Sequence, residues 1–299
     1  MDKYNEKITF YLPGAFTSFF ELLSYLMENY SHRKEIFKDN VELGCIYGSP
    51  KCIWNGGHYA NFEYSKAELQ QWKNFSQKYN IPIRFTFTNS LLKEEHLKDC
   101  YGNLLLEEFN TGKNEIICVS DLLEKYIRNK YGKSFKYISS TSKSLINKEL
   151  QMEEINKDYY LTVLDIDHNA DYDFLKQIQK KEKVELLCNS TCQDNCPRKK
   201  AHYTYISKMQ LEYGGNQLEK DPFSDCPHQR SLLYERKILH KNFISPDSIN
   251  NIYIPLGFKH FKLEGRFTTP PEWIETIVYF LIKDEYALQV RQEMFKLIW

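Results

Sequence analysis

The chain alternates short apolar runs with longer segments in which apolar residues recur every three or four positions. Short runs rich in β-branched and aromatic residues are typical of buried strands, and the longer spacing is typical of amphipathic helices. Leu22, Leu23 and Leu26, for example, share one face of a helix predicted over 16–30. The predicted strands are 7–12, 43–47, 82–88, 115–119, 135–139, 160–165, 184–188 and 260–264.

A helix is predicted after each of these strands. The helices are 16–30, 66–79, 93–109, 122–131, 147–156, 171–181, 247–252 and 270–282. Pro13-Gly14 is expected to end the first strand, the third helix is expected to break near Tyr101-Gly102, and Ser120 is the expected cap of the fourth. Eight successive βα units predict an α/β protein with a single TIM-like (β/α)8 barrel. A doubly wound open sheet has the same alternation and remains the alternative.

No shift in composition divides the chain, which predicts one domain over 1–299 with a long, decorated loop at 189–255 after strand seven. In such barrels the C-terminal ends of the strands carry the active site. We therefore expect the polar residues at these ends to meet at one mouth. They are Asn89, Ser90, Ser120, residues 139–141, Asp165, Asp167, His168 and Glu264.

Half of the eight cysteines gather at strand seven and in the loop after it. They are Cys188, Cys192, Cys196 and Cys226, spaced C-x3-C-x3-C-x29-C. Thiolates on loops at a strand end can hold zinc or an iron–sulfur cluster. The spacing differs from the C-x2-C-x2-C run of ferredoxins and from the paired C-x2-C knuckles of zinc ribbons. Buried, inert thiols are the alternative, and His202 and His228 are near enough in sequence to be substitute ligands.

Glu264 and Arg266 flank Gly265 at the end of strand eight. An arginine there can clamp a carboxylate or phosphate, and a glutamate can orient a base or a metal-bound group. A Glu–Arg ion pair that stiffens the strand end is the simpler interpretation. Of the remaining cysteines, Cys45 and Cys118 lie in apolar runs and are predicted to be core residues.

Charge is balanced, with 40 basic and 40 acidic residues, so no overall field draws the chain to nucleic acid or an anionic membrane. The basic run 198–200, followed by His202 and Tyr203, could contact RNA, although a solvated helix start explains it as well. No apolar stretch is long enough to span a membrane and no secretory signal is recognisable, so we expect a cytoplasmic protein with reduced thiols. Dinucleotide, P-loop, zinc-peptidase and serine-hydrolase motifs are missing.

Two stretches resemble a known family. GFKHFKLEGR at 257–266 is similar to the F-K-[IL]-E-G-R signature of the collagenase-like peptidase family, family U-thirty-two. ELLCNSTCQDNCPRKKAHY at 185–203 resembles the strand-seven cysteine loop of one branch of that family. The resemblance implies a TIM-like barrel and, for several members, an oxygen-sensitive 4Fe–4S cluster held by four cysteines. Those members take part in oxygen-independent hydroxylation of ubiquinone precursors or RNA bases.

Carried over by position, Cys192, Cys196 and Cys226 match cluster ligands best, and Glu264 and Arg266 match the signature. Cys188 is the remaining candidate for the fourth ligand, but it stands where the closest branch has an aliphatic strand residue, so the fourth ligand stays open. The resemblance thus implies an iron–sulfur oxidoreductase, hydroxylase-like, with a small-molecule or RNA substrate and a protein partner or electron donor.

Three other functions remain open. One is a collagenase-like peptidase or other hydrolase that activates a water molecule. A second is a radical enzyme that uses S-adenosylmethionine. The third is a non-enzymatic binding protein whose loop is stapled by zinc, which is also the alternative metal.

Overall fold

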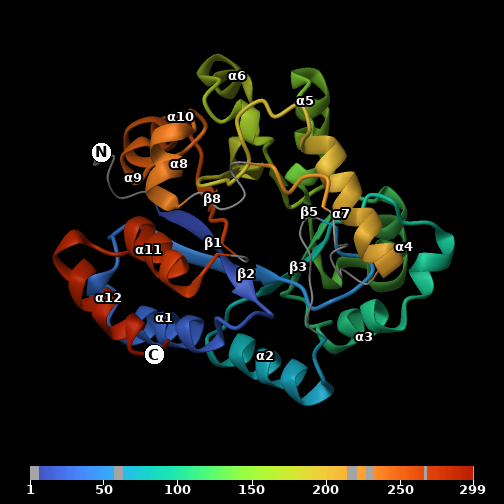
Figure 1. Ribbon diagram of the computed structural model, residues 1–299, viewed down its shortest axis with the longest axis horizontal. Coiled ribbons are helices and arrows are strands. Elements are labelled where there is room, and N and C mark those ends of the chain that lie inside the picture. Colours follow the sequence, from blue (N-terminus) through green and yellow to red (C-terminus); the bar gives the residue numbers. More distant parts are fainter. Residues whose placement is uncertain (1–6, 57–62, 214–220, 227–231, 266–267, 299) are drawn as a thin grey trace.

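Eight parallel strands close into a barrel in sequence order, with β8 paired to β1 (Figure 1). The computed structural model describes residues 7–56, 63–213, 221–226, 232–265 and 268–298. The strands are β1 Ile8–Ala15, β2 Val41–Gly48, β3 Ile83–Phe87, β4 Glu115–Cys118, β5 Lys136–Ser139, β6 Leu161–Val163, β7 Val184–Leu187 and β8 His260–Lys262. The closed order confirms the predicted TIM-like barrel and excludes the open doubly wound sheet.

The helices surround the barrel. Those that follow β1 to β6, the helical stretch near 247–252 and the helix after β8 were predicted. The helices are α1 Phe20–His32, α2 Lys66–Lys78, α3 Cys100–Glu108, α4 Asp121–Tyr131, α5 Lys148–Asn156, α6 Tyr172–Gln177, α7 Lys199–Tyr213, α8 Leu233–Leu239, α9 Pro246–Ser248, α10 Ile254–Leu256, α11 Pro270–Leu281 and α12 Ala287–Phe295. The Ser120 hydroxyl accepts a hydrogen bond from the Leu123 amide, which confirms the predicted cap of α4. Among the described residues, no helix is long and apolar enough to cross a membrane.

One prediction about the strands was wrong. β1 runs through Pro13-Gly14 because Pro13 and Ala15 continue to pair with β2, and an irregularity at Gly14 (φ 122°) absorbs the turn. The helical region after β3 is broken, as predicted, but at Asp99, whose carboxylate caps α3 by accepting from the Gly102 amide, so Gly102 lies inside the helix. Helices α7, α8 and α12 are additional to those predicted.

Each strand presents alternate side chains to the barrel interior and to the surrounding helices. The outward residues, such as Phe85 and Phe87 of β3, join the main apolar core between strands and helices. The inward apolar residues form a separate layer inside the barrel. They are Tyr11, Cys45, Tyr47, Ile117, Ile138, Leu161 and Val163.

An ion network fills the interior beside this layer. The Arg84 guanidinium of β3 is fully buried, and its Nε lies 2.7 Å from Glu115 Oε2 of β4. Its Nη1 donates to both carboxylate oxygens of Glu185 in β7, at 2.8 and 2.6 Å. Lys262 of β8 lies 3.8 Å from Glu185 Oε1. Arg84 also stacks 4.1 Å from the centre of the Tyr11 ring, so the barrel interior has a charged core that joins distant strands.

Candidate functional site at the barrel mouth

The loop after β7 is fastened to the end of β8 through Glu264. Asn189 and the Glu264 backbone exchange two hydrogen bonds, Nδ2 to the Glu264 carbonyl at 2.9 Å and the Glu264 amide to Oδ1 at 2.7 Å. The Thr191 hydroxyl and amide donate to the two Glu264 carboxylate oxygens at 2.7 and 3.2 Å. Since Thr191 precedes Cys192, Glu264 orients the start of the cysteine loop.

The other end of the loop is held by a buried lysine. Lys199, the first residue of α7, is 4% exposed, and its Nζ lies 2.6 Å from Asp165 Oδ1 and 2.7 Å from Asp167 Oδ2. Burial opposes the ammonium form, but the two carboxylates outweigh it and raise the pKa of Lys199. Asp167 also accepts from the Asn195 amide at 2.8 Å. The interpretation of 198–200 as a solvated helix start is therefore wrong for Lys199.

The segment with Cys226 is joined to the cysteine loop by an arginine. Both Arg198 terminal nitrogens donate to Asp225 at 3.0 Å, and Nη2 donates to the Pro222 carbonyl at 2.7 Å. Phe223 of the same segment stacks on His202, with ring centres 4.6 Å apart. Arg198 is two residues after Cys196, and Asp225 is next to Cys226. These contacts bring the two half-buried cysteines to one place.

The thiols differ in environment. Burial raises the pKa of Cys192 to about 12, and the nearby Glu264 carboxylate adds to this, so the metal-free thiol is protonated at neutral pH. Cys188 is fully buried in the apolar layer between barrel and helices, and burial raises its pKa well above the ordinary value. The structure therefore places Cys188 in the core and leaves Cys192, Cys196 and Cys226 half-buried outside it.

Cys192, Cys196 and Cys226 do not form a ready site for a metal ion. Among the described positions, no three His, Cys, Asp or Glu side chains are gathered tightly enough to hold one. His202 is engaged in its stack with Phe223, and His228 lies outside the described residues.

Several other predicted site residues have structural roles. Asn89 Nδ2 donates to the carbonyls of Ile53, Asn55 and Ser207, which fixes the loop after β3. The Ser139 hydroxyl binds Glu154 at 2.5 Å, and the buried His168 ring binds the Leu145 carbonyl at 3.0 Å. Cys45 and Cys118 are core residues, as predicted. Arg266 lies outside the described residues.

Lys199, Asn189 and Thr191 are mouth residues that sequence reasoning missed. Lys199 could have been identified from its position, because it is the first residue of a helix that starts next to the cysteines. Asn189 lies two residues after the end of β7, as Asp165 does after β6, and this equivalent position could have identified it.

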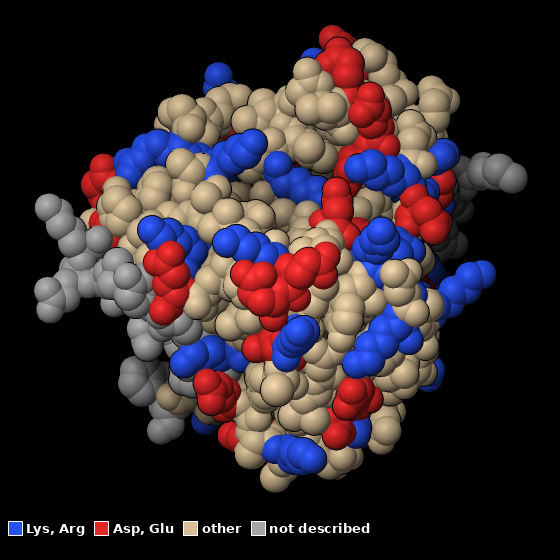
Figure 2. Space-filling view, turned by 90° about the vertical axis from the view of Figure 1, so that its right-hand side faces the viewer, with Lys and Arg blue, Asp and Glu red and all other residues tan. Residues whose placement is uncertain are grey.

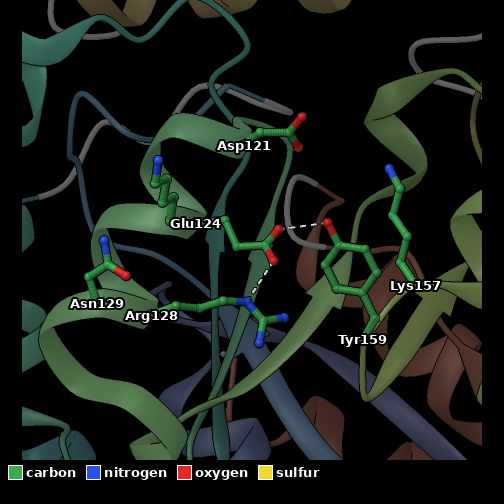
Figure 3. A pocket seen from close by; sticks show the side chains of 7 residues that line it. Asp121, Glu124, Arg128, Asn129, Lys157 and Tyr159 are labelled. Carbon is green, nitrogen blue, oxygen red and sulfur yellow. Dashed lines mark hydrogen bonds and ion pairs between the residues drawn. The ribbon is translucent and has the colours of Figure 1, made fainter.

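A pocket of about 330 Å³ lies on the barrel flank, between α4 and the segment before β6. Figure 3 shows Glu124 between Arg128 and Tyr159, with Glu124 oxygens 2.7 Å from Arg128 Nε and 2.6 Å from the Tyr159 hydroxyl. Basic and acidic side chains are interspersed over the face seen in Figure 2. This face thus agrees with the balanced charge of the chain, and Glu124 and Arg128 form an ion pair within the pocket.

No protein-family model and no curated protein matches this sequence. Among solved structures, the chain is similar to the U32 peptidase Mk0906, with a TM-score of 0.53 and 13% sequence identity. The similarity covers 87% of this chain and 94% of that one. The chain has a U32-like barrel fold. At this identity the similarity establishes the fold only. Any chemical activity has to be argued from the residues at the barrel mouth.

Proposed function

We propose that the chain binds an iron–sulfur cluster at the barrel mouth through Cys192, Cys196 and Cys226. The observation that carries the proposal is the bridge from Arg198 to Asp225, at 3.0 Å. It joins two segments that each carry a thiol near the anchoring residue, Cys196 near Arg198 and Cys226 beside Asp225. An exposed ion pair contributes little to the free energy of folding. The Arg198–Asp225 pair matters here because of the two segments that it holds together.

The surroundings of the thiols support an anionic group. Cys196 lies just before the N-terminus of α7, a 15-residue helix, where the helix dipole favours negative charge. Arg198 adds a positive charge, and the negative charges of Cys196 and Cys226 contribute to its raised pKa after the larger effect of Asp225. A cluster with three protein thiolates would supply electron transfer and one iron atom open to a substrate. We therefore favour an oxidoreductase, hydroxylase-like, acting on a small molecule or RNA.

Anaerobic purification followed by iron and sulfide analysis tests the proposal. We expect a brown protein with visible absorption, and loss of iron and colour in Cys192→Ser and Cys226→Ser variants. Cys100→Ser is the matched control because Cys100 is exposed. Cys188→Ala is expected to keep the cluster. A colourless, iron-free wild-type protein would refute the proposal, and bound zinc without visible absorption would select the zinc-stapled alternative.

A second candidate is a hydrolase of the peptidase kind, which is favoured by the fold similarity to a U32 peptidase. Glu264 would be its carboxylate, but both carboxylate oxygens of Glu264 already accept hydrogen bonds from Thr191. Gelatin cleavage by wild-type protein that disappears in Glu264→Gln would support this candidate. Gelatin that stays intact with freshly prepared wild-type protein would count against it.

A further inference from the structure

Positive charge gathers where three neighbouring strands begin, at the end of the barrel opposite the mouth. The chain enters β5, β6 and β7 through segments 132–136, 157–161 and 178–184, which contain six lysines and two acidic residues. The lysines are Lys133, Lys136, Lys157, Lys180, Lys181 and Lys183, and the acidic residues are Asp158 and Glu182. The corresponding segments that enter β2, β3 and β4 contain two lysines and two acidic residues, at 37–41, 79–83 and 109–115. The excess is therefore local, in a chain without net charge.

The three entry segments lie side by side. β5, β6 and β7 are neighbours in the barrel, and adjacent strands are about 4.8 Å apart. The Lys136 ammonium lies 4.2 Å from the centre of the Tyr160 ring, which joins the segment before β5 to the segment before β6. The Lys183 ammonium donates to the Lys157 carbonyl at 2.8 Å, which joins the segment before β7 to the same neighbour. The six lysines therefore belong to one surface, which we call the lysine surface.

Most of the charge on the lysine surface is not neutralised. Lys136 and Lys157 each lie within 4.0 Å of a buried glutamate. Within the described part of the chain, the other four lysines form no ion pair, and all four are exposed or half-buried. The Asp158 carboxylate has a basic partner of its own, because it lies 3.7 Å from Arg128 Nη1. Four uncompensated ammonium groups on one surface attract a ligand that carries several negative charges.

Tyr160 adds an exposed aromatic ring to the lysine surface. It is 43% exposed, whereas the other apolar side chains of the three segments are buried. Those buried side chains are Phe135, Tyr159, Leu161, Ile178 and Val184. Basic groups that follow a phosphate backbone, beside an aromatic ring that stacks on bases, are the two elements of a surface for single-stranded nucleic acid. An anionic membrane would require several apolar side chains that insert, and the three segments expose one.

We propose that the lysine surface binds single-stranded nucleic acid. The four lysines without carboxylate partners bind phosphate groups, and Tyr160 stacks on a base. The active sites of such barrels lie at the C-terminal ends of the strands, so a nucleic acid docks here at the end opposite the cysteines. The binding therefore does not rest on the proposed iron–sulfur function, and protein prepared with or without iron should bind equally.

Fluorescence anisotropy of the full chain with labelled oligouridine and oligothymidine, each of about 12 nucleotides, measures the binding at several KCl concentrations. Each phosphate that is neutralised contributes about −0.7 to the slope of log K against log[KCl], so four lysines predict a slope of about −3. Lys133→Gln combined with Lys180→Gln should halve this slope and weaken binding at least tenfold at low salt. The matched control is Lys66→Gln combined with Lys93→Gln, at exposed positions after β2 and β3, which should bind like the wild type.

Tyr160→Leu separates nucleic acid from other polyanions. It should weaken the binding of both oligonucleotides at least fivefold with the salt slope unchanged, because it removes base stacking, and should leave the binding of heparin, which has no bases, as in the wild type. Tighter binding of one oligonucleotide would identify RNA or DNA as the ligand, and equal binding would support contacts to backbone and bases common to both.

Four results would overturn the proposal. They are no binding of either oligonucleotide by the wild type, equal losses in the two lysine double variants, wild-type affinity in Tyr160→Leu, and binding of phosphatidylserine vesicles without binding of either oligonucleotide. An iron-free protein that binds both oligonucleotides as expected would refute the cluster alone.

Discussion

Replacing Arg84 with methionine is the sharpest test of the charged barrel interior. Methionine keeps most of the volume of the side chain but leaves Glu115 and Glu185 without their shared partner, at sites where both carboxylates are almost fully buried. Breaking a buried ion pair by removing one partner costs about 3–5 kcal/mol. Two carboxylates lose their partner here, which favours the upper end of that range.

Two nearby lysines should limit the loss of stability. Lys262 is 3.8 Å from Glu185, and Lys136 is 4.0 Å from Glu115. With this compensation, we expect Arg84→Met to lower the free energy of unfolding by about 4 kcal/mol. That is a large part of the 5–15 kcal/mol that typically stabilises a folded chain, so the variant should unfold at a much lower urea concentration.

Urea unfolding followed by circular dichroism measures the effect. Adding Glu185→Gln to Arg84→Met should recover part of the loss, because it removes one uncompensated charge. Lys78→Met is the control, since the Lys78–Glu28 pair is exposed, and it should leave the urea midpoint almost unchanged. A loss below about 1 kcal/mol in Arg84→Met, or no recovery in the double variant, would refute the account of the network.

Three further predictions concern other ion pairs and the thiols. Lys199→Met should cost about 3 kcal/mol and expose α7 to limited proteolysis, because it leaves two buried carboxylates unpaired, whereas the exposed neighbour Lys200→Met should change neither. In Glu154 burial raises the pKa, but hydrogen bonds from Lys143, Lys157 and Ser139 outweigh it and lower the pKa to about 2. This stabilisation, about 2 kcal/mol, is present above the unfolded pKa near 4.5 and is lost as pH falls towards 2, so wild type and Glu154→Gln should converge in acid unfolding. Cys192 should react slowly with iodoacetamide at pH 7 in the folded metal-free protein and faster once the protein is unfolded in urea, whereas early, complete labelling of the folded protein would contradict its burial.

The strands could be predicted because a buried parallel strand needs a short apolar run, and eight such runs are separated by helical spacing. Helix α7 was missed because its buried face holds Lys199, Ser207 and Gln210, so the apolar spacing that marks a helix is absent. Nothing in the local sequence tells a buried lysine from a solvated one, since its partners come from the end of another strand.

The ion network was missed for a related reason. Arg84 and Glu185 interrupt apolar strands, which is a signal of an inward charge that could have been used. Their pairing could not be predicted, because 101 positions separate them and only the closed barrel brings them together. Within the site, the sequence sufficed to propose Cys192, Cys196 and Cys226 as a group, and the core position of Cys188 required the structure.

The network inside the barrel also bears on how this sequence can change over evolutionary time. Loss of Arg84 leaves two carboxylates in the interior without their shared partner, yet replacing the whole set by apolar residues of similar volume can be neutral or even stabilising. Descendants that lose the charges one at a time pass through variants close to the threshold for folding. We therefore expect these three positions to vary together among relatives of this chain, as a charged set or as an apolar one.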